Sequence, residues 1–227
     1  MSNFISSSIG KKVVMSLSGL FLVMFLCVHL GINMLLLFDK SGELFNLGCH
    51  FMTNPVIKVI EPILALGFII HIAWASVLTI QNRKARPIKY AVRNQKNNCT
   101  WSSRNMYVLG AMMLVFILIH LTDFWAAIKL GQGAQGEMTH ITIGGVEMEN
   151  VYPHVVSAFT NPIYCILYVA GGILLGMHLA HGFWSMFQSV GLCNNIWRTR
   201  WSILAKLFAI VVAAGFSIIP IIMFFTC

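Results

Sequence analysis

Five long apolar stretches, separated by polar connectors, dominate the pattern of this chain. They cover residues 13–38, 56–82, 105–128, 162–188 and 203–226. Each is long enough to cross the hydrocarbon core of a membrane, which takes about 20 residues as a helix. Lipid offers no partner to free backbone N–H and C=O groups, so we expect all five to be helices. The pattern predicts an all-α integral membrane bundle of five transmembrane helices, forming a single domain over residues 1–227.

Composition supports a lipid environment. The chain is 58% hydrophobic and 10% charged, whereas a soluble domain has about 25% charged residues. A net charge of +8 would suggest a nucleic-acid partner in a soluble chain, but here the charge falls in the connectors. The six cysteines show no paired short spacing, which argues against a zinc site, an iron–sulfur site or a disulfide framework.

The lysines and arginines predict the orientation of the helices. The amino terminus, the second connector (83–104) and the fourth connector (189–202) carry most of them, including Lys11, Lys12, Arg198 and Arg200. The first and third connectors carry few basic residues and most of the acidic ones. Basic loops stay in the cytoplasm. We therefore expect a cytoplasmic amino terminus and an external carboxyl terminus.

An internal repeat relates the stretches in pairs. The tripeptide Thr-Asn-Pro precedes the second and fourth stretches, at 53–55 and 160–162. Asparagine as N-cap with proline at the first helical position is a good helix start. In both copies a histidine follows the proline by sixteen residues (His71 and His178). We therefore predict that helices three and four repeat helices one and two in the same orientation, and that helix five lies outside the repeat.

Histidines inside the stretches are the main candidates for chemistry. They are His29, His71, His120, His178 and His181. An ionisable residue in a membrane span is costly and is a functional-site hypothesis by default. A bond to a carbonyl of a neighbouring helix explains one such residue more easily than residues in four spans. His50, His140 and His154 fall in the outer connectors, where we expect solvated loop residues.

The depth of the histidines divides them into two pairs. His29 lies roughly 25 Å along its helix from the cytoplasmic end and His120 roughly 24 Å, whereas His71 and His178 lie roughly 15–18 Å from it. Bundles bind haem between imidazoles that face each other at one level, whereas zinc or copper prefers three or four ligands at one depth. We therefore predict two haem b groups, with these four histidines as axial ligands of the iron: an outer haem on His29 and His120, and an inner one on His71 and His178.

His181 complicates the inner pair, because residues three apart share a helix face. It lies one turn nearer the cytoplasm, and the repeat spacing selects His178 as the ligand. We expect His181 to lie beside a haem edge.

Several motifs resemble a known family. The stretches Gln81–Pro87, Trp101–Met106 and His178–Trp184, with histidines in four of five spans, resemble the single-chain, two-haem cytochrome b subunit of succinate:quinone and quinol:fumarate oxidoreductases (respiratory complex II), of Bacteroidetes type. The resemblance covers nearly the whole chain. In that family the fourth ligand stands four residues before a glycine, which His178 and Gly182 match.

The resemblance implies a membrane anchor that passes electrons between an iron–sulfur subunit and quinone, with menaquinone the expected substrate, in a bacterial inner membrane. It also implies that FAD and the iron–sulfur clusters sit on two partner subunits at the cytoplasmic face, where the dicarboxylate chemistry takes place. The whole complex is a candidate dimer. The direction of the reaction stays open.

Quinone reduction takes up protons, so its site needs a titratable group. Two acids qualify as catalytic candidates: Asp123, beside the outer haem, and Glu61, at the outer interface on the same side of the membrane. The alternative for each is an interfacial carboxylate at a helix end. A cytoplasmic site near Lys12, Ser16 and Ser18 is the fallback.

Two other functions compete with this reading. One is a proton-coupled transporter or channel with a histidine relay; the other is the haem b subunit of a hydrogenase or formate dehydrogenase.

Overall fold

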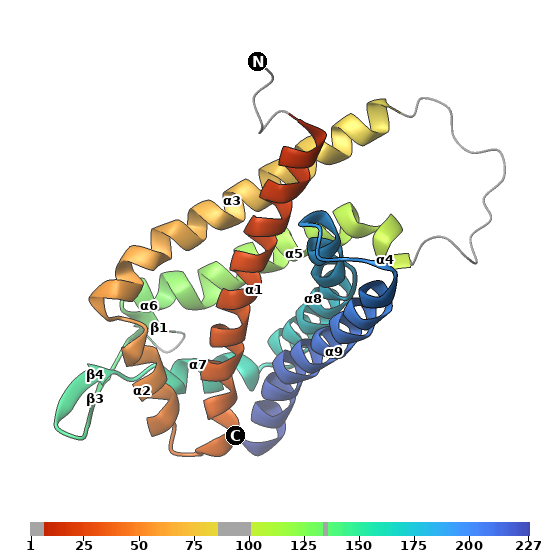
Figure 1. Ribbon diagram of the computed structural model, residues 1–227. Helices are drawn as coiled ribbons and strands as arrows, with labels where there is room; N and C mark the ends of the chain where they lie inside the picture. Colours follow the sequence, from red (N-terminus) through yellow and green to blue (C-terminus); the bar gives the residue numbers. More distant parts are fainter. Residues whose placement is uncertain (1–6, 86–100, 134–135) are drawn as a thin grey trace.

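The structure is a computed structural model that describes residues 7–85, 101–133 and 136–227, and most of these are helical (Figure 1). The long helices are α1 (Ser8–Phe38), α3 (Pro55–Lys84), α5 (Met106–His120), α8 (Pro162–Ser189) and α9 (Asn195–Thr226). A π-helix, η2 (Leu121–Ala126), and the short α6 (Ala127–Lys129) continue α5. All five helical segments are long and apolar enough to cross a membrane. The prediction of five apolar helices of membrane-spanning length is confirmed, and these helices indicate a multi-pass membrane protein.

The connectors hold structure that the apolar pattern did not predict. They contain α2 (Glu43–Phe51), α4 (Trp101–Arg104), α7 (Tyr152–Phe159) and the strands β1 (Gln132–Gly133), β2 (Gly136–Glu137), β3 (His140–Ile143) and β4 (Val146–Glu149). The strands form two antiparallel hairpins, β1–β2 and β3–β4. The bundle is mostly helical, in agreement with the all-α prediction; the short strand pairs lie in the third connector, where a glycine pair with positive φ at 144–145 closes the β3–β4 turn.

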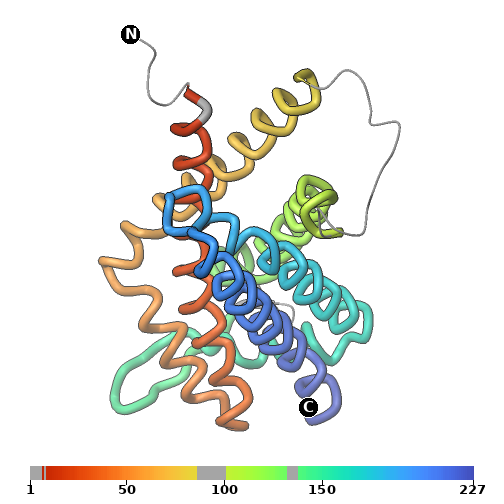
Figure 2. The backbone as a smooth tube through the Cα atoms, turned by 45° about the vertical axis from the view of Figure 1, so that its right-hand side comes forward, coloured from red at the N-terminus to blue at the C-terminus, as the bar shows by residue number. Residues whose placement is uncertain are grey.

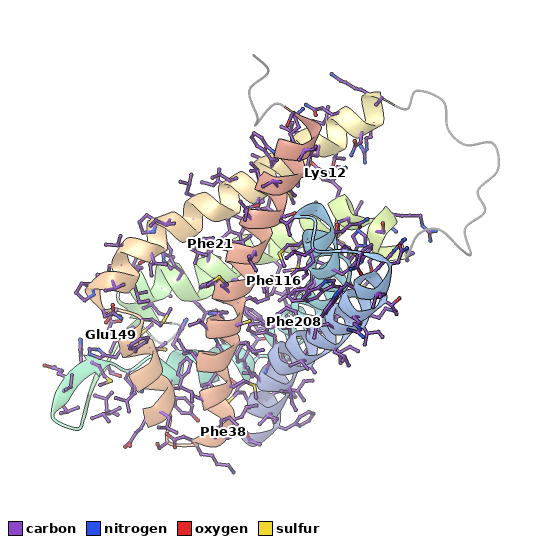
Figure 3. The ribbon with its side chains drawn as sticks, viewed as in Figure 1. Lys12, Phe21, Phe38, Phe116, Glu149 and Phe208 are labelled. Carbon is purple, nitrogen blue, oxygen red and sulfur yellow. The ribbon has the colours of Figure 1, made fainter. Side chains whose placement is uncertain are left out.

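The basic residues at helix termini gather toward one end of the molecule. We call this the basic end; it comprises Lys11, Lys12, Arg83, Lys84, Arg104, Arg198 and Arg200. In Figures 1 and 2 the start of α1, the end of α3, α4 and the turn between α8 and α9 lie in the upper half. The carboxyl terminus, α2 and the β3–β4 hairpin lie below them; we call this the hairpin end. Figure 3 labels Lys12 at the first end and Phe38 at the second.

The predicted helix starts are confirmed. Asn54 accepts hydrogen bonds from the backbone N–H groups of Val56 and Ile57, and Asn161 accepts one from Ile163. The fifth helix begins at Asn195, eight residues before the predicted position, because Asn194 caps it. Arginines 198 and 200 lie inside this helix, and charged residues do not break a helix in the way that glycine or proline does.

The interior of the bundle has two parts. At the hairpin end, the core comprises Leu36, Phe45, Val151, Val155, Phe159, Tyr168, Ile219 and Met223. Asn46, which is 1% exposed, locks this region: its Oδ1 accepts from the backbone N–H groups of Val151 and Tyr152. This region packs α2 and α7 against α1, α8 and α9, so it fixes the position of α7 and of the side chains that α7 carries.

Small residues let helices approach in the middle of the bundle. A Cβ on Gly176 would lie 2.6 Å from the Cβ of Ala213, so α8 and α9 touch nearly backbone to backbone, as small residues permit in membrane helices. Phe116 of α5 covers Gly171 of α8, and Phe21 of α1 covers Gly67 of α3; Figure 3 labels both phenylalanines. These contacts set the spacing between the helices that carry the histidines.

A leucine at Gly176 is expected to separate α8 from α9. Overpacking of a close contact costs about 1–3 kcal/mol or more, and here the clashing atoms include the backbone oxygen of Ala209. The measurement is thermal stability and monodispersity of the purified protein in detergent. Gly31→Leu is the control, because no atom of the described residues lies within 4 Å of a Cβ at Gly31. Equal stability of the two variants would contradict this account of the packing.

Candidate functional site

The structure brings His29 and His120 together. His29 lies on α1 and His120 is the last residue of α5, with their ring centroids 5.7 Å apart and their planes at 80°. Aromatic rings surround this pair: Phe25 and Phe216 beside His29, and Phe116, Phe124 and Tyr168 beside His120. The rings cover part of both imidazoles.

His71 and His178 form the second facing pair. They lie on α3 and α8, with ring centroids 6.4 Å apart and planes at 61°. The ring of His181 lies edge-on to Trp184 of its own helix, with the ring centroids 5.9 Å apart. The imidazole that faces His71 is therefore that of His178, the residue that the repeat selected.

Each pair has the separation that two ligands of one metal need. With each donor nitrogen about 2 Å from the metal, the centres of two imidazoles on opposite sides lie roughly 6 Å apart. Among residues 7–85, 101–133 and 136–227, no group of three or more His, Cys, Asp or Glu residues is placed to hold a metal. Two protein ligands suit a metal that brings its remaining ligands with it, as haem iron does.

Unpartnered polar atoms also fit a bound group. Within the described part of the chain, three buried nitrogen atoms lack a hydrogen-bond partner: Trp74 Nε1, His120 Nδ1 and His178 Nδ1. Such atoms are uncommon in folded proteins and call for an explanation. Trp74 stands three residues after His71, on the same face of α3, and His181 holds the corresponding place after His178. Both rings can present an N–H one turn from the inner pair.

Glycines give the inner pair its clearance. A Cβ on Gly19 would lie 3.7 Å from Cε1 of His71, and a Cβ on Gly110 would lie 3.6 Å from Cε1 of His178. Each glycine also stands ten residues before a histidine of the outer pair, His29 or His120. This spacing is a second signal of the repeat, and the sequence analysis missed it.

Asp123 lies in η2, directly after the outer pair. Its Oδ2 accepts a hydrogen bond from the hydroxyl of Tyr168 at 3.2 Å, and its backbone carbonyl accepts one from Nε2 of His154 at 2.7 Å. His154 was predicted to be a solvated loop residue. That is wrong: it is 9% exposed, because α7 packs it into the hairpin end. π-Helical turns such as η2 occur often at functional sites.

Glu61 has different partners from Asp123. Its carboxylate pairs with Nζ of Lys129 at 2.8 Å and accepts from Nε1 of Trp125 at 2.6 Å. These bonds tie α3 to the end of the third span. The two predicted acids therefore belong to separate hydrogen-bonded groups. Glu61 pairs with a lysine, whereas Asp123 accepts a hydrogen bond from the phenol of Tyr168 and lies three residues after His120.

Comparison with protein families, with curated proteins and with solved structures finds no match to this chain.

Proposed function

We propose that the chain is the membrane anchor and di-haem b electron-transfer subunit of a succinate:quinone or quinol:fumarate oxidoreductase. In this role it passes electrons between an iron–sulfur subunit and menaquinone in a bacterial inner membrane. The observation that carries the proposal is the pair of facing histidine couples, His29 with His120 and His71 with His178. Four helices supply one imidazole each, which a single structural histidine bond does not explain.

The residues present fit two haem groups. The two couples would supply two imidazole ligands to each haem iron, the glycines leave clearance beside the inner couple, and Nε1 of Trp74 offers a hydrogen-bond donor. Bound haem supplies one-electron transfer. The chain itself would hold each iron ligand in place, cover the outer imidazoles with aromatic rings, and set the spacing of the two couples along the bundle. The matching positions of Gly19 and Gly110 support a parallel repeat of α1–α3 and α5–α8.

The partners are proposed to dock at the basic end, with the amino terminus in the cytoplasm. The flavoprotein and iron–sulfur subunits would meet Lys12, Arg104 and Arg198 there. Two other cations of the basic end contact aromatic rings: Arg200 lies over the ring of Trp197 and Arg83 over that of Tyr107. Residues 86–100 of the basic second connector lie outside the described residues. The inner couple, nearer this end, would receive electrons first when succinate is oxidised.

Quinone is proposed to react near the outer couple. Reduction of a quinone to a quinol consumes two electrons and two protons, so its oxygens must lie within reach of a proton donor. Asp123, with Tyr168 and His154, provides a titratable group close to His120. Glu61 is the second candidate, and its ion pair with Lys129 makes a structural role the competing assignment.

The test is to purify the chain from membranes with whatever subunits accompany it. The expected result is a red protein with a reduced b-type spectrum, two haems per chain, and co-purifying subunits that contain FAD and iron–sulfur clusters. A colourless protein would contradict the proposal and favour a histidine-relay transporter. Two haems together with a hydrogenase or formate dehydrogenase subunit would keep the cofactor assignment and overturn the choice of complex.

A further inference from the structure

Ser18 of α1 makes two contacts that define its role. Its Oγ lies 3.0 Å from the backbone carbonyl oxygen of Met15 and 3.2 Å from Nδ1 of His71. A carbonyl only accepts, so the single hydroxyl hydrogen goes to Met15. The serine oxygen is then an acceptor, and Nδ1 of His71 must carry the hydrogen. The other ring nitrogen, Nε2, is left with a free lone pair.

Within the described part of the chain, only the first half of the predicted repeat has a serine that bonds the inner histidine. The neighbour of Ser18 is Gly19, which approaches His71; the matching positions in α5 are Leu109 and Gly110, which approaches His178. The side chain of Leu109, which is 1% exposed, has no hydrogen-bonding group, and Nδ1 of His178 has no partner among the described residues. One imidazole of the inner couple therefore has its tautomer fixed by the protein, and the other does not.

We propose that Ser18 is a positioning residue that sets the reduction potential of the inner haem through His71. An acceptor on Nδ1–H orients the ring and raises the basicity of the coordinating nitrogen. A more basic ligand favours ferric over ferrous iron, so the bond lowers the potential. This inference rests on the proposed function, since it needs a metal on Nε2.

Ser18→Ala in the full complex is the test. A hydrogen bond contributes about 1 kcal/mol net, so we expect the ferric-to-ferrous equilibrium of the inner haem to change roughly threefold to tenfold toward ferrous. A tenfold change is 59 mV for one electron. The measurement is a potentiometric titration of the b-type absorption. The inner component is assigned as the one that is missing from His71→Ala.

Two matched variants complete the design. Ser18→Thr keeps the hydroxyl and should restore the original potential, since threonine can also bond a carbonyl one turn back. Ser189→Ala removes a hydroxyl that bonds the backbone carbonyl of Ser185 on α8, about two turns beyond His181, and both potentials should stay unchanged. If the wild-type complex holds two haems and Ser18→Ala titrates as wild type does, the role of Ser18 is refuted while the haem assignment stands. A wild-type complex without haem instead refutes the proposed function.

Discussion

Replacing His29 or His120 with alanine is expected to remove the outer haem and leave the inner one, and His71→Ala or His178→Ala should do the reverse. Each couple has two protein ligands on separate helices. Loss of one ligand leaves the iron without half of its protein attachment, so haem content should fall from two per chain to about one. The measurement is haem per chain, with the reduced spectrum showing which component remains.

His181→Ala is the matched control for this series. Its ring contacts Trp184 of the same helix, so both haems should stay bound. A shifted inner potential is expected, because the side chain stands one turn from His178. If His181→Ala loses a haem while His178→Ala keeps both, the fourth ligand is wrongly assigned. If all four ligand variants keep two haems, the facing couples are structural pairs only.

The spans and the histidine couples were predictable because membranes impose simple rules on a chain. A helix that crosses lipid needs about 20 apolar residues, so the five spans follow from composition alone. The spacing of His71 and His178 from their Asn-Pro helix starts then fixed the level of each ring. The histidines of the inner couple face each other at one level because their helices start at matching positions, confirmed at Asn54 and Asn161.

The missed features depend on contacts between distant segments. His154 is buried only because α7 packs into a core made by α2, α8 and α9; nothing in its local sequence separates it from a loop histidine. The turn of π-helix after His120 likewise has no signal in the sequence, because the apolar pattern predicts a helix over 105–128 but not which backbone hydrogen bonds it forms. The β3–β4 hairpin pairs His140 with Glu149, and its strands are too short for an alternation to stand out.

Asp123→Asn is expected to slow the quinone reaction while both haems stay bound. The asparagine keeps the shape of the side chain and its bond from Tyr168, but it cannot release a proton. Positioned proton donors contribute typically 10²- to 10⁴-fold to a rate, so a loss of at least tenfold is expected. The assay compares quinol oxidation with the reaction of an artificial dye that exchanges electrons with the soluble subunits, which should be unaffected.

Tyr168→Phe and Glu61→Gln separate the two acids. Tyr168→Phe removes the hydroxyl that bonds Oδ2 of Asp123 and keeps the ring against His120, so it should reproduce part of the Asp123→Asn defect. Glu61→Gln breaks the ion pair with Lys129; a lower thermal stability with full quinone activity would make Glu61 a structural link between α3 and the third span. If Glu61→Gln loses quinone activity and Asp123→Asn does not, protons enter at the lysine-paired acid. If neither variant affects the quinone reaction, the site is not at the outer couple, and the side chains of Lys12 and Ser16 at the opposite end of α1 become the next positions to replace.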